Sequence, residues 1–265
     1  LAVAIDTLVE DVHFPRGTDP ADIGWKALAV NLSDLAAMGA SPAWALLGLT
    51  LPQADRAFVE GFADGFSRLA GAHRLALVGG DTTRGPLTVS VAVHGFVPPG
   101  KALTRAGACV GDAVLVTGTL GDAAAGLNVL QQWRRDEDDR GQLRDYLVER
   151  LNRPTPRLAA GVALREQAHA CVDVSDGLLA DLGHICAASG VGAEIDAALL
   201  PRSSALLGLY DDATALQFAL GGGDDYELCF TVPPQRLSQV QADLSRLGCG
   251  VTRIGRIVAG SGVRV

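Results

Sequence analysis

Strand-like and helix-like patterns alternate over residues 1–97 of this 265-residue chain. Apolar or β-branched side chains recur at every second position along residues 3–9, a spacing typical of a β-strand. The other elements expected in this region are helices at 22–38 and after Pro52, and strands at 43–51, 75–78 and 87–97. The order βαβαββ predicts an α+β layer in which the helices cover one face of a sheet.

The sequence Pro-Pro-Gly-Lys at 98–101 interrupts this pattern and is the predicted domain boundary. It would separate an N-terminal α+β domain of residues 1–98 from a C-terminal α/β domain of residues 102–265. In the second part, strands are expected at 113–117, 170–174, 193–195, 227–232 and 251–258, and helices at 122–133, 143–151 and 156–167, from Leu178 and from Pro234. We interpret the charged residues 134–140 as a solvated loop.

Composition narrows the class of partner. The net charge of −8 and the lack of any Lys/Arg-rich run argue against nucleic acid and anionic membranes. The longest apolar run, 43–51, is far shorter than the roughly 18 residues of a membrane-spanning helix. The five scattered cysteines predict free thiols in a reducing cytoplasm rather than a zinc site. The chain starts within a strand pattern at Leu1, without a leader, so we expect native residues before it and no secretion.

Aspartates beside glycines, at the ends of predicted elements, carry the chemistry. They are Asp6, Asp34, Asp81, Asp173, Asp176, Asp224 and Asp225. Mg²⁺ prefers oxygen ligands and is bound by one or two carboxylates together with substrate phosphates. Glycines let backbone N–H groups approach phosphate oxygens closely. The repeated pattern therefore predicts a site for a metal–nucleotide complex.

Each segment also has a structural interpretation. Asp34 could face solvent on an amphipathic helix, together with Asn31. Asp176 could cap the following helix, and Asp81 could form an Asx turn. His13 beside the first strand fits a structural role as well as a binding role. Local spacing leaves these alternatives open.

The segment 114–126 is typical of a strand, a glycine loop and the start of a helix. Free N–H groups at a helix N-terminus can bind phosphate. The segment lacks the Lys-Ser/Thr of a P-loop and the middle glycine of a dinucleotide fingerprint, so a tight turn fits equally well. No Gly-x-Ser-x-Gly motif occurs, and no residue is a candidate for nucleophilic catalysis.

Taken together, these segments resemble the thiamine-monophosphate kinase family, of the superfamily that includes aminoimidazole ribonucleotide synthetase and selenophosphate synthetase. The matching pieces, in family order, are residues 6–14, 31–40, 77–84, 103–105 with 111–112, 118–126, 153–156, 173–179 and 222–228. The resemblance implies a two-domain aminoimidazole ribonucleotide synthetase-like fold and an ATP-dependent kinase that converts thiamine monophosphate to thiamine diphosphate. It also implies a homodimer that pairs through the N-terminal domain, with ATP bound near the interface.

The resemblance assigns roles to individual residues. It implies that several Mg²⁺ ions are bound by Asp6, Asp34, Asp81, Asp173 and Asp176, that ATP contacts Gly80, Asp81, Arg105 and Ser175, and that the substrate contacts His13 and Asp224. The family usually has Glu in place of Asp224, which shortens this side chain by one methylene. No general base or nucleophile is expected, because a phosphate monoester with a second pKa of about 6 is already mostly dianionic.

Two alternatives stay open. The chain could be another ATP-dependent enzyme of the same superfamily, acting on an amide or an inorganic anion. It could also be a non-catalytic regulatory protein that binds ATP and Mg²⁺. Retention of the five aspartates in the metal set argues against a decayed site.

Overall fold

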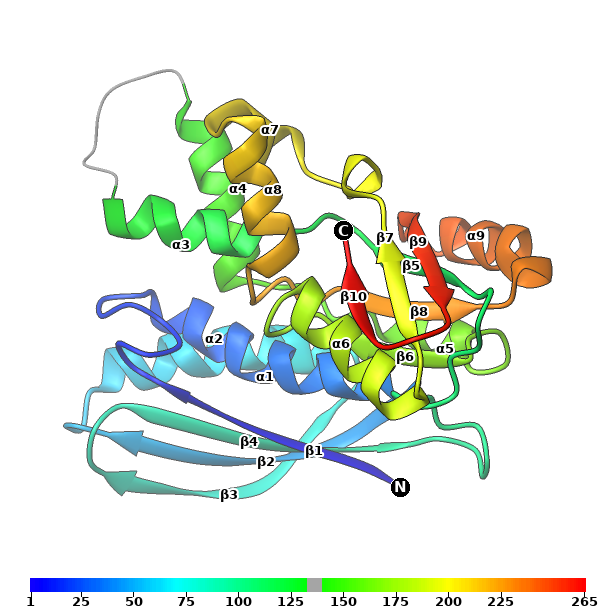
Figure 1. Cartoon of the computed structure of the whole chain (residues 1–265). Helices are drawn as coiled ribbons and strands as arrows, with labels where there is room; N and C mark the ends of the chain where they lie inside the picture. Colours follow the sequence, from blue (N-terminus) through cyan, green and yellow to red (C-terminus); the bar gives the residue numbers. More distant parts are fainter. Residues whose placement is uncertain (133–139) are drawn as a thin grey trace.

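The computed structural model describes residues 1–132 and 140–265 and contains two β-sheets with helices around them (Figure 1). The predicted charged loop at 134–140 lies outside the described residues, except for Arg140. The strands are β1 (Ala2–Val9), β2 (Ser41–Leu51), β3 (Ala76–Arg84), β4 (Thr88–Phe96), β5 (Ala113–Thr117), β6 (Ala170–Asp173), β7 (Gly192–Ile195), β8 (Leu228–Val232), β9 (Val251–Val258) and β10 (Gly262–Arg264). The helices are α1 (Pro20–Ala37), α2 (Arg56–Ala72), α3 (Asp122–Gln132), α4 (Gly141–Asn152), α5 (Leu158–Leu164), α6 (Leu178–Ser189), α7 (Ser204–Leu209), α8 (Asp212–Gly221) and α9 (Leu237–Arg246), with the short 3₁₀ helices η1 (Ala197–Leu199) and η2 (Pro234–Arg236).

The first sheet has the order β1-β4-β2-β3, and α1 and α2 lie on one of its faces (Figure 1). Strands β1 and β2 each pair with β4 antiparallel, and β3 pairs with β2 parallel. Glycines at positions 24 and 65 let the two helices approach closely. A Cβ at Gly24 would lie 2.1 Å from the carbonyl oxygen of Phe62, and a Cβ at Gly65 would lie 1.8 Å from that of Ala21. The predicted α+β layer with helices on one face is confirmed.

The second sheet has the order β10-β7-β9-β5-β8-β6. Every residue of β5, β6 and β8 is buried, which explains why these segments are nearly continuous apolar runs. Helices α3, α4 and α7 pack together beside this sheet (Figure 1). Among the described residues, no helix is both long enough and apolar enough to cross a membrane.

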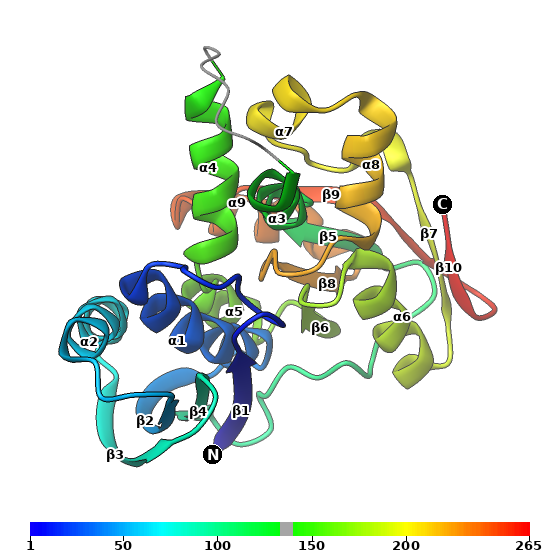
Figure 2. The ribbon, with the colours of Figure 1, turned by 90° about the vertical axis from the view of Figure 1, so that its left-hand side faces the viewer.

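Helix α1 connects the two parts of the molecule, because it packs on the first sheet and also contacts α5 and β6 (Figure 2). Gly161 of α5 allows this contact, since a Cβ there would lie 2.0 Å from the carbonyl oxygen of Ala36. The indole Nε1 of Trp25 donates to the carbonyl of Pro154 over 3.0 Å. As a result, one hydrophobic core contains side chains from both sheets.

The structure corrects the predicted elements in three places, the first of which is β10, a strand that was not predicted. The strand expected at 75–78 is the longer β3, and Asp81 lies within it rather than at its end. All nine residues of β3 are exposed, so burial imposes no alternating pattern on them. Helices α7 and α8 were not predicted from periodicity, although Ser203 and Asp211 are N-caps that accept hydrogen bonds from the backbone N–H groups of Leu206 and Thr214.

Candidate active site

A cavity of about 350 Å³ lies where β1 and α1 face the ends of β6 and the segment before β8. It contains eight of the ten site residues proposed from the sequence. These are Asp6, His13, Asp34, Arg105, Asp173, Ser175, Asp176 and Asp224. Carboxylates up to 218 positions apart in the chain (Asp6 to Asp224) therefore line one space.

Asp6 and Asp34 are positioned by contacts between β1 and α1. The backbone N–H of Asp6 donates to Oδ1 of Asn31 over 2.9 Å. The Nδ2 of Asn31 donates in turn to the carbonyl of Ala27, which fixes the amide orientation. Asn31 is buried and Asp34 half-buried in the cavity wall, so their shared helical face points at the site and not at solvent.

Asp173 ends β6 and is buried, with 5% of its surface exposed. Its Oδ2 accepts a 2.7 Å hydrogen bond from the hydroxyl of Ser33, which comes from α1. Ser33 was not predicted as a site residue. It is adjacent to Asp34 in the sequence, but nothing local indicates that it holds a carboxylate 140 positions away.

Burial, and after it repulsion between neighbouring carboxylates, raises the pKa values of these acids. Burial, followed by repulsion from Asp173 and Asp6, raises the pKa of Asp34 to about 7, although the charge of Arg105 opposes the shift. Burial raises the pKa of Asp173 to about 6, against the hydrogen bond from Ser33. Burial also raises the pKa of Asp6. The cavity thus gathers more negative charge than its protein cations neutralise, and a bound cation would favour the ionised forms.

The loop after β6 is shaped by Asp181 of α6. Its Oδ2 accepts hydrogen bonds from the backbone N–H groups of Ser175, Asp176 and Gly177 at 3.0, 3.1 and 3.1 Å. Gly177 has a φ of 116°, and a Cβ there would lie 2.9 Å from the backbone of Gly221. The helix-cap interpretation of Asp176 is wrong, because Gly177 is the N-cap of α6 and Asp176 lines the cavity.

At the other end of the cavity, Asp224 forms an ion pair with Lys26 of α1. The Lys26 Nζ lies 3.0 Å from Asp224 Oδ2 and 3.3 Å from the carbonyl oxygen of His13, and its side chain is only 3% exposed. The Tyr226 hydroxyl donates to Oδ1 of Asp224 over 3.0 Å. His13 Nδ1 accepts a hydrogen bond from the N–H of Val9. Sequence reasoning missed Lys26 and Tyr226; a lysine within an otherwise apolar helix face was the available signal for the first.

His13 and Asp224 also line a second cavity of about 260 Å³ beside the first. Phe14, Leu127 and Leu151 provide apolar walls there. The two residues proposed to contact the substrate therefore lie where a charged cavity meets a partly apolar one.

Gly80 and Asp81, the other two residues proposed from the sequence, lie outside this cavity, on β3. This strand forms the edge of the first sheet opposite to β1, which carries Asp6. Asp81 is exposed, and its Oδ1 accepts a hydrogen bond from the N–H of Thr82. A Cβ at Gly80 would lie 1.9 Å from the carbonyl oxygen of Leu47, so strand pairing requires glycine at this position.

The glycine loop before α3 is a tight strand-to-helix turn. The N–H groups of Gly121 and Ala123 donate to Oδ2 and Oδ1 of Asp225 at 2.6 and 3.3 Å. Burial raises the pKa of Asp225 to about 8, although these hydrogen bonds oppose the shift. The carboxyl group of Asp225 already accepts hydrogen bonds from these N–H groups. The segment is therefore a tight turn, as one of the two interpretations of the sequence had it, and not a phosphate site.

Comparison with known proteins agrees with this geometry. The sequence model described as AIR synthase related protein, N-terminal domain, matches residues 1–97, and the corresponding C-terminal domain matches residues 110–265. The thiamine-monophosphate kinase of Escherichia coli (strain K12) is 52% identical, over 98% of this chain and 79% of that protein. The one from Bacillus subtilis (strain 168) is 38% identical, over 96% and 79%.

Solved structures agree as well. The crystal structure of thiamine-monophosphate kinase from Stenotrophomonas maltophilia K279a superimposes with a TM-score of 0.96 at 53% identity, over 100% of this chain and 84% of that one. The structure described as AaThiL complexed with AMPPCP and TMP gives 0.88 at 36% identity, over 98% and 82%. The chain therefore belongs to the thiamine-monophosphate kinase family of AIR synthase related proteins.

Proposed function

We propose that this protein transfers the γ-phosphate of ATP to the phosphate of thiamine monophosphate, giving thiamine diphosphate and ADP. The observation that carries the proposal is the convergence of Asp6, Asp34, Asp173 and Asp176 in one cavity, next to His13 and Asp224. The relative complexed with AMPPCP, an ATP analogue, and TMP supports the choice of both substrates.

The donor set of the cavity fits Mg²⁺. Its acidic members offer hard carboxylate oxygens, which this ion prefers. Burial raises the pKa values of Asp34 and Asp173, and repulsion from neighbouring carboxylates adds to the shift, so a bound cation would favour their ionised forms. We infer that Asp6, Asp34, Asp173 and Asp176 hold the ions. When bound, Mg²⁺ would offset the repulsion between two polyanionic substrates and stabilise charge during transfer.

Other side chains would bind and orient the substrates. Arg105 carries a permanent positive charge and can donate two parallel hydrogen bonds to a phosphate. Ser175 offers a hydroxyl on the same wall. His13 and Asp224, at the mouth of the second cavity, would contact thiamine monophosphate, whose cationic ring suits a carboxylate and apolar walls. Lys26 and Tyr226 hold Asp224 in place for this contact.

The transfer would be direct. The acceptor phosphate is its own nucleophile, because its second pKa is about 6 and it needs no general base at neutral pH. The protein's contribution is alignment of donor and acceptor and electrostatic stabilisation. Incubation with radiolabelled ATP alone tests this step: we expect no labelled protein, and a stable phosphoprotein would exclude direct transfer.

We further propose a homodimer that forms through the first sheet. The face of this sheet away from α1 and α2 exposes Val3, Ile5 and Leu46, at 51%, 66% and 41%. Contiguous apolar side chains on a sheet face are typical of an interaction surface. Pairing of two such faces would allow Gly80 and Asp81 of one copy to reach the cavity of the other, as the family resemblance implies.

Mixing two inactive variants tests this arrangement. If Asp34 and Asp81 act in the same copy, a mixture of Asp34→Asn and Asp81→Asn protein stays inactive. If they act across the interface, subunit exchange restores about a quarter of wild-type activity, since half of the dimers are mixed and one of their two sites is intact. Each variant re-equilibrated alone is the matched control.

The reaction itself is tested by ADP release that depends on thiamine monophosphate, with thiamine diphosphate identified as product. Turnover with an amide or an inorganic anion instead would favour another enzyme of the superfamily. Binding of ATP and Mg²⁺ without turnover would favour a regulatory protein.

The domain division and location belong to the same proposal. Division into residues 1–98 and 102–265 is supported by the separate sheets and by family matches that end at 97 and start at 110. A cytoplasmic location is supported by the five cysteines, all free.

A further inference from the structure

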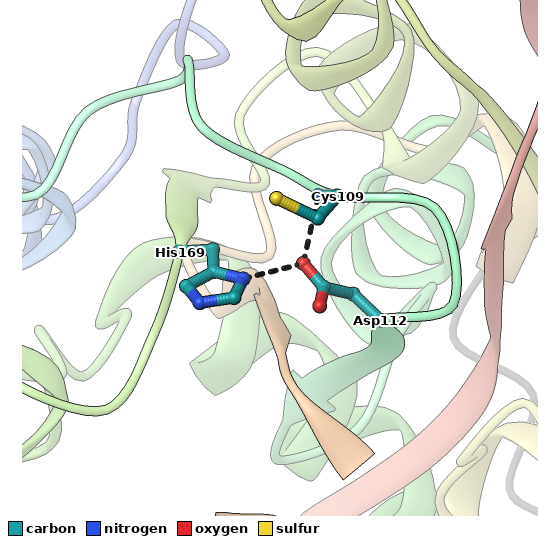
Figure 3. Close-up of side chains that lie close together, drawn as sticks. All are labelled: Cys109, Asp112 and His169. Carbon is teal, nitrogen blue, oxygen red and sulfur yellow. Dashed lines mark hydrogen bonds and ion pairs between the residues drawn. The ribbon is translucent and has the colours of Figure 1, made fainter.

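Three potential metal ligands lie together outside the cavity, between the segment that joins β4 to β5 and the residue before β6. They are Cys109, Asp112 and His169 (Figure 3). Asp112 Oδ2 lies 2.8 Å from His169 Nδ1 and accepts a 2.9 Å hydrogen bond from the N–H of Cys109. One ligand atom from each side chain lies within 4.8 Å of the others.

The backbone around this cluster is fixed by hydrogen bonds. Asp112 donates its N–H to the carbonyl of Cys109 over 3.0 Å and accepts at its own carbonyl from Ile257 over 2.8 Å. The N–H of His169 donates to the carbonyl of Thr231 over 2.8 Å. The Asp112 side chain is 3% exposed, so its carboxylate is held in the interior while the cysteine is open to solvent. The three ligands are therefore preorganised and accessible from one side.

We propose that Cys109, Asp112 and His169 form a second cation site, for a transition metal of the Zn²⁺ class. Thiolate, imidazole and carboxylate are the three ligand types that Zn²⁺ takes in proteins, and three protein ligands leave a fourth position for water. Mg²⁺ prefers a purely oxygen environment, which the cavity offers and this cluster does not. The donor chemistry thus separates two metals between two sites.

Metal binding requires the ligand atoms to move apart slightly, and it releases one proton. A tetrahedral ion with bonds of about 2.0–2.3 Å holds its ligands roughly 3.3–3.8 Å apart. The 2.8 Å contact between His169 Nδ1 and Asp112 Oδ2 is a hydrogen bond, which the ion replaces. The neutral imidazole keeps its proton by moving it to Nε2, and the thiol of Cys109 releases one proton to solvent. The resulting site has no net charge, since one thiolate and one carboxylate balance the divalent ion.

The position of the site ties it to the catalytic cavity. Cys109 follows Arg105 by four residues, and His169 precedes Asp173 by four. The Ser189 hydroxyl already links the N–H of Ala108 to the carbonyl of Arg105. A metal ion would replace the single Asp112–His169 hydrogen bond by coordinate bonds to three side chains, and so strengthen the connection between the segment that follows Arg105 and the residue before β6. Binding should therefore stabilise the folded protein.

Titration with Co²⁺ in the presence of excess Mg²⁺ tests the proposal, because Mg²⁺ saturates the carboxylate cavity. We expect one equivalent of Co²⁺ to give a thiolate-to-cobalt charge-transfer band and the strong d–d bands of four-coordinate cobalt, both removed by Zn²⁺. Cys109→Ser should lose the charge-transfer band. Asp112→Asn should weaken Co²⁺ binding by more than the roughly 10- to 100-fold that loss of a hydrogen-bond partner of a ligand costs.

His184→Asn is the matched control, since His184 lies in a carboxylate–histidine cluster with Asp176 and Asp181 that has no thiol. It should keep the charge-transfer band, whereas His169→Asn should lose most of the affinity. Absence of the band in wild-type protein, or its persistence in Cys109→Ser, would overturn the proposal.

Two further measurements do not depend on a spectrum. In excess Mg²⁺, Zn²⁺ should raise the Tm of wild-type protein clearly more than that of Cys109→Ser. Cys109 is the one exposed thiol of five cysteines, all of them in the described part of the chain, so iodoacetamide should label it first in the native protein. Zn²⁺ should slow that labelling. Equal labelling rates with and without Zn²⁺ would contradict the site.

Discussion

Two groups of acidic side chains have opposite surroundings. The cavity cluster consists of Asp6, Asp34, Asp173 and Asp176. The buried cluster, beside the start of α3, consists of Asp122, Asp225 and Glu227, all at most 1% exposed. The difference lies in their partners. Members of the cavity cluster face mainly one another across open space, whereas those of the buried cluster are surrounded by donors.

Glu227 is the centre of the buried cluster. Both its oxygens accept hydrogen bonds of 2.6 Å from Arg157, and they also accept from Arg150 at 3.0 Å and from the Thr117 hydroxyl at 2.6 Å. Such saturation leaves no lone pair for a ligand and holds α4, β5 and the start of α5 against β8. Carboxylates with satisfied oxygens stabilise the fold, and crowded carboxylates without cations are free to bind one.

The largest effect that this comparison predicts is on stability. Glu227→Ala removes the carboxylate that pairs with Arg157 and leaves Arg150 its longer contact of 3.7 Å with Asp122, so we expect it to lower the free energy of unfolding by about 3–5 kcal/mol. Urea denaturation measures the loss. Glu166→Gln is the control, because its ion pair with Lys101 is exposed and should contribute at most about 1 kcal/mol. Equal losses in the two variants would show that the buried cluster is not structural.

The second prediction is that loss of a carboxylate from the cavity cluster lowers activity but does not lower stability. We expect Asp34→Asn to reduce turnover by about 100- to 1,000-fold, as for loss of one preorganised charged group. The same change should leave stability equal or higher in the absence of metal, because it removes repulsion with Asp173 and Asp6. Steady-state kinetics at saturating Mg²⁺ and urea denaturation in EDTA test both parts. If Asp34→Asn destabilised the protein as much as Glu227→Ala does, the cavity cluster would be structural like the buried cluster.

Local sequence could not make this distinction. The segment 221–227 sends Asp224 to the cavity, while Asp225 and Glu227 enter the buried cluster. Their partners are remote, since Lys26 is 198 positions from Asp224 and Arg157 is 70 from Glu227. Contacts with remote residues decide whether each of these acidic side chains joins the cavity cluster or the buried cluster. Such contacts cannot be seen in the pattern of adjacent residues.

The alternation of side chains predicted β1, and the helical spacing of Ile23, Leu28, Leu32 and Leu35 predicted α1, although α1 is buried on several sides. Periodicity found only the start of β3, which is exposed throughout and therefore carries no constraint from burial. The family resemblance found eight residues of the cavity. Ser33 and Lys26 escaped because they act through other protein side chains, and such contacts leave no motif in the sequence.

The third prediction is that the two clusters differ in how pH and Mg²⁺ change the stability of the protein. The pKa of Asp34 is raised from 3.8 in the unfolded chain to about 7, so the folded state binds the proton more tightly. In EDTA, stability should therefore fall as the pH rises from about 4 to about 7. Asp225, with a pKa of about 8, should extend the fall to about pH 8. Mg²⁺ should offset the part due to Asp34 and Asp173, but not the part due to Asp225.

Urea denaturation across this pH range measures the effect. At pH 8, Mg²⁺ at about 100 times its Kd should raise the free energy of unfolding by about 2.7 kcal/mol, and by less at pH 5, where Asp34 is protonated. Asp34→Asn should reduce this gain, and Asp225→Asn should retain it. Equal stabilisation by Mg²⁺ at both pH values, or its loss in Asp225→Asn, would place the metal outside the cavity cluster.

The smallest effect concerns His13, at the border between the cavity cluster and the second cavity. The His13 side chain is exposed and accepts a hydrogen bond from the N–H of Val9, so its removal should perturb the fold little. We expect His13→Ala to raise the KM for thiamine monophosphate about tenfold, equivalent to about 1.4 kcal/mol, with a smaller change for ATP. His73→Ala, at the end of α2, is the matched control. Selective loss of acceptor binding would assign the second cavity to thiamine, whereas equal changes in both KM values would mean that His13 supports the metal–phosphate region as a whole.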